Sequence, residues 1–329
     1  MGLPEGLLER EARELEDVLG APALLHLPGR REPALFVSVL LHGNETTGWE
    51  AVRRVLRRYG GGPLPRAMSV FVGNVAAARS GQRRLDGQPD YNRIWRGSGT
   101  PEHALAAEVH ARMAERGVLA SVDIHNNTGR NPHYGCVNRL DHRFLHLATL
   151  FSRTVVYFTR PDAVQSNAFA ELAPAITVEC GQPGDASGAA HAAELVDAML
   201  HLREVPVHPV PRHDYDLYHT VATVNVRDSV RFGFEGGELV LRDDLDRLNF
   251  RELPAGTGLA EVRGRSGAAE DYVVARDEQG AEVTDRYFHV DRGELRTRLR
   301  VMPSMLSHDP TIIRQDCLCY LMERLPPLA

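Results

Sequence analysis

Short apolar runs and longer amphipathic segments alternate along the first two thirds of the chain. The apolar runs are rich in β-branched residues and predict strands at 34–41, 68–75, 119–125, 154–159 and 175–180. Segments with apolar residues three and four positions apart predict helices around 46–59, 102–116, 141–152 and 187–203. Strands that alternate with helices in this way indicate an α/β protein with a mixed central sheet and helices on both of its faces.

The pattern changes at about Val205. Prolines at 206, 209 and 211 indicate a linker, and short alternating strands separated by Gly and Asp turns follow it. We therefore expect two domains, an α/β domain at 1–205 and a smaller C-terminal β-rich domain at 206–329.

Composition and charge limit the kinds of molecule that we expect this protein to bind. The chain has 329 residues, 43% of them apolar, which is enough for one large core and a second, smaller one. Its formal net charge of −6 gives no attraction for polyanions, so we expect neither a nucleic acid nor a membrane as a partner. All 38 basic residues are arginine, which excludes a Schiff-base lysine and a P-loop lysine.

Cysteine usage and the N-terminal segment bear on the cellular compartment. The four cysteines form no C-x-x-C pair, and the first 20 residues are acidic and amphipathic, unlike a signal peptide. No stretch approaches the roughly 20 apolar residues of a membrane span. We therefore expect a cytoplasmic protein. No helix carries a sustained heptad seam, so the sequence does not define an oligomeric state.

Polar residues that can bind metal stand where three predicted strands end. The strand at 34–41 leads into His42 and Glu45, the strand at 119–125 ends in His125, and the strand at 175–180 carries Glu179 near its end. Ligands of open α/β sheets bind outside the carboxyl ends of the strands. Two histidines, a glutamate ligand and a further carboxylate are what a catalytic zinc needs, whereas any one of them alone is common by chance.

Local backbone geometry can explain the three-residue spacing of His42 and Glu45. Positions i and i+3 face opposite sides of a strand, but both side chains can reach one ion from a turn that leads into a helix. We expect Gly43 to relax that turn, and Thr46 or Thr47 to cap the following helix. Asp123, two residues before His125 on the same face, can hold the free nitrogen of that imidazole.

Four ordered motifs resemble a known family. "HGNE" (42–45), "DIHNN" (123–127), "VECG" (178–181) and the segment "GNVAAARSGQRRLDGQPDYNRIW" (73–95) are similar to motifs of the succinylglutamate desuccinylase/aspartoacylase family, within the carboxypeptidase A-like zinc hydrolases. The resemblance covers about residues 34 to 190. It implies a zinc carboxypeptidase-like fold, with residues 1–205 as the catalytic domain, and one zinc ion per chain.

Residue roles follow from the resemblance. It implies that His42, Glu45 and His125 bind zinc and that Glu179 is the general base. Arg83 would stabilise the oxyanion, although the segment before Asn92 is one residue longer than the family pattern, so Arg84 is an alternative. Asn92 and Arg93 would hold a carboxylate of a small-molecule substrate. The implied activity is hydrolysis of an amide bond in an N-acyl amino acid or a related small amide.

The sequence also departs from the family pattern upstream of Glu179. Relatives that cleave N-acetylaspartate carry an arginine there, but residues 161–175 contain no basic residue. The resemblance therefore does not favour N-acetylaspartate as the substrate.

Two alternatives stay open. One is a metallocarboxypeptidase that trims peptides, and the other is a catalytically inactive zinc-binding relative. Glu179 argues against the second, because a site that only binds needs no further carboxylate beside an open metal position. The sequence has no G-x-S-x-G elbow, which disfavours a serine hydrolase.

Overall fold

The computed structural model describes residues 2–127, 129–263 and 267–328. It divides into two compact units. The first comprises Met1–Asn126, His133–Leu217 and Pro326–Ala329, and the second comprises Asn127–Pro132 and Tyr218–Leu325. The segment between His201 and Asp216, which contains the predicted linker and is described throughout, has no helix or strand.

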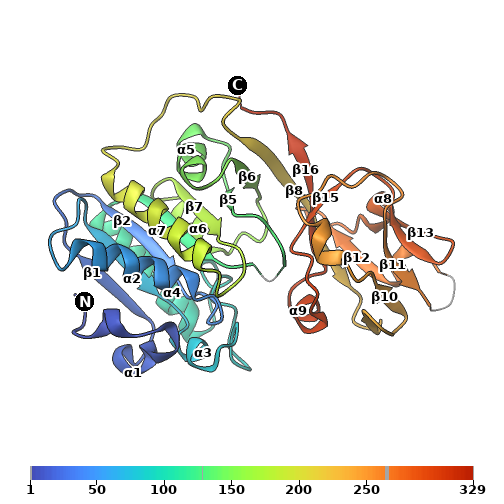
Figure 1. Cartoon of the computed structure of the whole chain (residues 1–329), viewed down its shortest axis with the longest axis horizontal. Helices are drawn as coiled ribbons and strands as arrows, with labels where there is room; N and C mark the ends of the chain where they lie inside the picture. Colours follow the sequence, from blue (N-terminus) through green and yellow to red (C-terminus); the bar gives the residue numbers. More distant parts are fainter. Residues whose placement is uncertain (1, 128, 264–266, 329) are drawn as a thin grey trace. The chain divides into compact units, whose positions relative to one another are not determined.

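The first unit has the predicted alternation of strands and helices (Figure 1). Its strands are β1 (Ala23–Leu27), β2 (Ala34–Val39), β3 (Met68–Val72), β4 (Val118–His125), β5 (Tyr134–Val137), β6 (Thr154–Tyr157) and β7 (Ala175–Glu179). Its α-helices are α1 (Leu15–Leu19), α2 (Thr47–Tyr59), α3 (Val75–Ser80), α4 (Pro101–Arg116), α5 (His142–Phe151), α6 (Gln165–Phe169) and α7 (Ala186–His201). All five predicted strands and all four predicted helices are present, whereas β1, β5, α1, α3 and α6 were not predicted.

The strands of this unit form most of a mixed sheet. Four further strands complete this 11-stranded sheet, namely β8 (Asp216–Val226), β12 (Val273–Arg276), β15 (Met302–Ser304) and β16 (Cys319–Leu325). The strand order is β1-β3-β2-β4-β7-β5-β6-β8-β16-β15, with β12 paired to β8. Strands β3, β2, β4 and β7 are parallel neighbours, whereas β5 is antiparallel to β7. The carboxyl ends of β2, β4 and β7 therefore lie at the same edge of the sheet.

Helices cover both faces of this sheet, as predicted. On one face, α2 lies so close that a Cβ atom on Gly48 would be 2.9 Å from Val39 and 3.2 Å from Ile124. Helix α7 packs beside α2 (Figure 1). On the other face, Phe169 of α6 stacks on Phe36 of β2 at 4.1 Å between ring centroids. Because strand residues alternate in direction, Asp123 and His125 face the α6 side, opposite to Ile124.

The second unit is rich in short strands. Its elements are β8 (Asp216–Val226), which begins in the first unit, β9 (Phe232–Gly233), β10 (Leu239–Leu241), β11 (Gly258–Val262), β12 (Val273–Arg276), α8 (Thr284–Tyr287), β13 (Phe288–Asp291), β14 (Glu294–Thr297), β15 (Met302–Ser304), α9 (Pro310–Gln315) and β16 (Cys319–Leu325). Strands β13, β14, β11, β10 and β9 form a separate five-stranded sheet in that order. Its apolar core includes Leu239, Leu259 and Leu295. Across the described residues, no helix has the length and apolar character needed to cross a membrane.

Candidate metal centre

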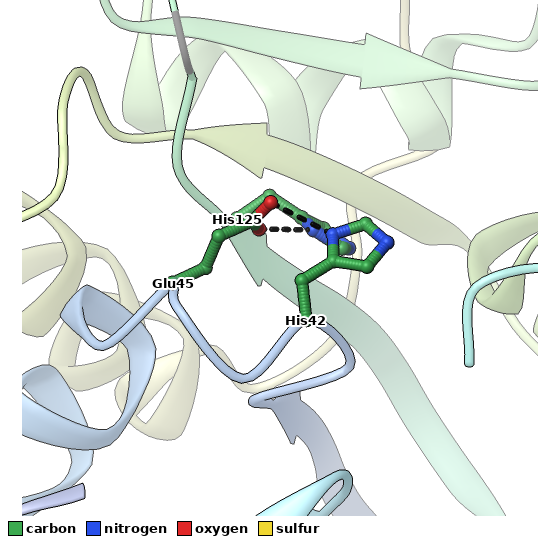
Figure 2. A group of neighbouring side chains, drawn as sticks. All are labelled: His42, Glu45 and His125. Carbon is green, nitrogen blue, oxygen red and sulfur yellow. Dashed lines mark hydrogen bonds and ion pairs between the residues drawn. The ribbon is translucent and has the colours of Figure 1, made fainter. Parts of the chain in front are cut away.

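His42, Glu45 and His125 meet at the carboxyl ends of β2 and β4 (Figure 2). The two carboxylate oxygens of Glu45 are shared between the imidazoles. His42 Nδ1 lies 2.7 Å from Oε1, and His125 Nδ1 lies 2.7 Å from Oε2. All three side chains are buried, with exposed fractions of 3 to 4%. The structure thus brings together the three residues that the sequence assigned to the metal.

A turn carries His42 and Glu45 away from β2, as their spacing predicted. The Glu45 N–H donates to the carbonyl of His42 at 3.1 Å. Gly43 lies in this turn, as expected, and its φ is not positive. Glycine is needed there for space, since a Cβ atom would lie 2.2 Å from the backbone nitrogen of Ala78 in α3.

The N-terminus of α2 is capped by a residue other than the two predicted threonines. Thr46 occupies the N-cap position of α2, but its side chain makes no capping hydrogen bond. The N–H of Thr47 instead donates to Oδ1 of Asn126, at 3.3 Å. Because Asn126 follows His125 directly, this bond joins the two loops that carry the triad.

A carboxylate faces the second nitrogen of each histidine. His125 Nε2 lies 2.7 Å from Asp123 Oδ2, as the shared strand face predicted, and Ser38 donates to the other oxygen of Asp123 at 2.6 Å. His42 Nε2 lies 3.0 Å from Asp90 Oδ1. Asp90 was not singled out from the sequence. Both imidazoles are therefore oriented so that Nδ1 points to Glu45.

Electrostatics at the triad depend on these pairs. Burial alone would raise the pKa of Glu45, but attraction to His42 and His125 lowers it well below its usual range. Burial alone would lower the pKa of His125, but Asp123 and Glu45 raise it well above its usual value. Burial alone would likewise raise the pKa of Asp90, but His42 and Arg83 lower it well below its usual range. The charged forms of Glu45 and His125 therefore stabilise each other.

Glu179 lies beside the triad on the next strand. It stands opposite His125 in the parallel pair of β4 and β7, and opposite Tyr134 in the antiparallel pair of β7 and β5. Its Oε2 atom is buried and has no hydrogen-bond partner among the described residues. Burial is the main reason that the pKa of Glu179 rises to about 8; attraction to His125 opposes the rise, and Glu45 adds to it.

The structure distinguishes Arg83 from Arg84. Arg83 Nη2 donates to Asp90 Oδ2 at 3.0 Å, and its Nη1 lies 3.5 Å from Glu45 Oε1. Arg84 is exposed and donates to the carbonyl of Gln88. Arg83 is thus directed toward the triad and Arg84 is not.

Asn92 and Arg93 lie next to Asp90 in the same irregular segment. Asn92 is buried, its Oδ1 accepts from the N–H of Gln165 at 2.9 Å, and its Nδ2 lies 3.2 Å from His125 Nε2. Arg93 is half-buried and donates to the carbonyl of Asn92 at 2.9 Å. The amide of Asn92 is therefore already engaged with the walls of the site, whereas Arg93 lies nearer to solvent.

These residues fit one metal ion. One donor atom from each of the three side chains lies within 4.8 Å of the others, and two imidazole nitrogens with a carboxylate oxygen are ligands that zinc takes. Carboxylates on the far nitrogens are typical of histidines that bind metal. The buried Oε2 of Glu179, left without a partner, adds a further acceptor beside the three ligands.

The fold and the site define the class of protein: an α/β protein of hydrolase fold with a buried His-Glu-His triad suited to one metal ion. Within that class, the family model "Succinylglutamate desuccinylase/Aspartoacylase catalytic domain" matches residues 31–203, more than half of the chain. The chain therefore belongs to the succinylglutamate desuccinylase/aspartoacylase family, as its motifs indicated.

Solved structures share this fold at low sequence identity. Succinylglutamate desuccinylase from Chromobacterium violaceum is similar with a TM-score of 0.62 and 18% identity, over 97% of this chain and 99% of that chain. Murine aminoacylase 3 is similar with a TM-score of 0.59 and 17% identity, over 90% of this chain and 97% of that chain. A succinylglutamate desuccinylase/aspartoacylase from Rhodobacter sphaeroides has a TM-score of 0.60 and 14% identity, over 92% and 89%. No protein with a curated description matches at a significant level.

Proposed function

We propose that this protein is a zinc-dependent amidohydrolase that removes the acyl group from an N-acyl amino acid or a related small amide bearing a carboxylate. The observation that carries the proposal is the placement of Glu179. A binding site for metal is complete with His42, Glu45 and His125, yet a further carboxylate stands beside His125 with one buried oxygen that has no partner among the described residues. A hydrolase needs such a group to move protons.

Zinc held by the triad would supply a Lewis acid that polarises the amide carbonyl and makes water more acidic. The chain's own residues do the rest. Glu179 accepts a proton from the attacking water and returns it to the leaving nitrogen as the C–N bond breaks. Burial raises the pKa of Glu179 to about 8, and a cation held by the triad would lower this pKa again, so that the carboxylate would be ionised and able to accept a proton.

Two arginines supply positive charge for the substrate. Arg83, fixed by Asp90, would stabilise the negative charge that develops on the carbonyl oxygen. Arg93 would bind the substrate carboxylate, because its guanidinium can offer two parallel N–H donors. Asn92, whose amide is engaged with Gln165, would support this binding chiefly by placing Arg93.

The test compares wild-type protein with Glu179→Gln, using Glu171→Gln as a control for an exposed glutamate that pairs with Arg96. Zinc content is measured by plasma mass spectrometry, and hydrolysis is measured on a panel of N-acyl amino acids with free or esterified carboxylates and on short peptides. We expect Glu179→Gln to keep zinc and to lose hydrolysis by about 10²- to 10⁴-fold.

Three results would contradict the proposal. Loss of zinc from Glu179→Gln would make Glu179 a ligand rather than a base. Cleavage of peptides in preference to N-acyl amino acids would favour the carboxypeptidase alternative. Equal rates on free and esterified substrates would remove the role given to Arg93.

A further inference from the structure

Two histidines form a direct hydrogen bond next to the strand that carries Glu179. His133, just before β5, and His191, in α7, lie with their Nδ1 atoms 2.9 Å apart. Their ring centroids are 5.1 Å apart and the ring planes differ by 30°, so each Nδ1 lies on the side of its ring that faces the other. One ring must donate and the other accept, because a single proton fits between two nitrogens.

The pair is fixed in place by its surroundings. Phe151 of α5 stacks on His191 at 4.1 Å and on His133 at 6.0 Å between ring centroids. Ser152 donates its hydroxyl to the carbonyl of His133 at 2.9 Å. Burial, together with the proximity of His191, lowers the pKa of His133, which favours the neutral ring that such a bond needs.

The imidazole of His133 covers Gly181, two residues after the end of β7. A Cβ atom on Gly181 would lie 3.0 Å from His133 Nε2, so the ring lies close against this glycine. Gly181 also has φ +73°, a conformation that favours glycine. His133 therefore packs on the backbone two residues after Glu179.

The same strand end is held from the side of the triad. Asn126 donates its side-chain amide to the carbonyl of Gly181 at 2.9 Å, and the N–H of Cys180 donates to the carbonyl of His125 at 2.9 Å. The contact with His133 adds to these two hydrogen bonds at the strand end.

The alternation of β5 links His133 to Glu179 by a second route. His133 points toward α5 and α7, so its neighbour Tyr134 points to the opposite face of the sheet, where it stands directly across from Glu179. Tyr134 is buried, with 4% of its surface exposed. Anchoring His133 therefore also fixes the wall beside Glu179.

We propose that the hydrogen bond between His133 and His191 positions Glu179, by holding the His133 ring over Gly181 and so fixing the end of β7. His133 and His191 are positioning residues and touch no reacting atom. The proposal rests on the proposed function in one respect, namely that the carboxylate so positioned is the base of a hydrolase.

The test uses three variants of the full-length protein. His191→Phe keeps an aromatic ring against Phe151 but removes the hydrogen bond. His191→Asn places an amide nitrogen near the position of Nδ1 and should restore the bond. His146→Phe is the matched control, because it removes another partly exposed histidine of the same unit, which bonds to the carbonyl of His208 at 2.8 Å.

One NMR signal reports the position of the His133 ring without any assay of activity. Cys180–Gly181 is the sole Cys–Gly pair in the sequence, so labelling cysteine with ¹³C at the carbonyl and glycine with ¹⁵N selects the amide of Gly181 alone. We expect this signal to shift in His191→Phe, to return in His191→Asn, and to stay in place in His146→Phe.

Kinetics on the substrate found for the wild-type protein complete the test. We expect kcat of His191→Phe to fall by about 10- to 100-fold, because a catalytic group displaced by about 1 Å can lose that much. KM and bound zinc should stay unchanged, and His191→Asn should recover most of kcat.

Each outcome has a distinct meaning. An unmoved Gly181 signal overturns the proposal, as does a shifted signal with unchanged kcat. A loss of zinc in parallel with kcat also overturns it, because the pair would then support the triad rather than Glu179. If the wild-type protein hydrolyses no amide but the Gly181 signal still shifts in His191→Phe, the histidine pair does hold the strand end. Only the proposed function is then contradicted.

Discussion

Zinc binding to the metal-free protein should release about two protons at pH 7, because two groups at the centre hold protons that the metal displaces. The first is His125. Its pKa is raised well above the ordinary value by Asp123 and Glu45, so the ring is charged at pH 7 and must lose a proton to bind metal. This group contributes about one proton.

Glu179 contributes most of the second proton. With a pKa of about 8, the carboxyl is about 0.9 protonated at pH 7 and about 0.2 protonated at pH 8.5. A divalent cation beside it favours the charged form and expels that proton. Zinc affinity therefore falls as the pH falls. The number of protons that Glu179 releases on zinc binding decreases as the pH rises through 8.

Calorimetry measures the proton count. Zinc is titrated into metal-free protein in buffers of different ionisation enthalpy. The slope of the observed binding enthalpy against the ionisation enthalpy of the buffer gives the number of protons released. The difference between wild type and Glu179→Gln isolates the glutamate, and we expect about 0.9 at pH 7 and about 0.2 at pH 8.5. A difference near zero at pH 7 would refute the reasoning, because Glu179 would then be ionised without metal.

Three further predictions concern residues around the centre. Asp90→Asn should lower zinc affinity or activity by about 10- to 100-fold, because the carboxylate that orients His42 loses its charge. Chelator competition measures the affinity and kcat measures the activity, and unchanged values of both would contradict this role of Asp90. Gly43→Ala should lower the free energy of unfolding in urea by about 1–3 kcal/mol or more, because the new methyl group meets the backbone of α3, whereas Gly236→Ala, with open space at that position, should not. The buried thiols of Cys136 and Cys180, whose pKa values burial raises, should react with a disulfide reagent only as fast as the protein unfolds, and prompt labelling at pH 8 would contradict their placement.

The parts of the site that could be predicted are those set by local sequence. His42 and Glu45 belong to one turn, His125 ends its own strand, and Asp123 shares the strand face of His125. An apolar run marks each of these strands, and the rule that parallel strands end at one edge brings their last residues together. Nothing beyond strand order is required to place them.

Other features of the site depend on chain segments that meet only in the fold. The cap of α2 comes from Asn126, 79 residues away, so Thr46 looked like the better candidate from local sequence alone. Gly43 was expected to serve a turn, but α3, which was not predicted, makes it necessary. Strand β5 escaped prediction because it has only four residues, one of them glycine, and its pairing with β7 is what stabilises it.

The two metal-site histidines differ in whether their aspartate partner could be predicted from local sequence. Each presents Nδ1 to Glu45 and Nε2 to an aspartate, so the two aspartates have the same task. Asp123 is two residues from its histidine and could be predicted from strand geometry. Asp90 is 48 residues from its histidine, in a segment without helix or strand, and the structure alone reveals it. Asp90 also pairs with Arg83, so the same carboxylate that orients a metal-binding histidine fixes the arginine proposed to meet the substrate, and the two cannot be moved independently.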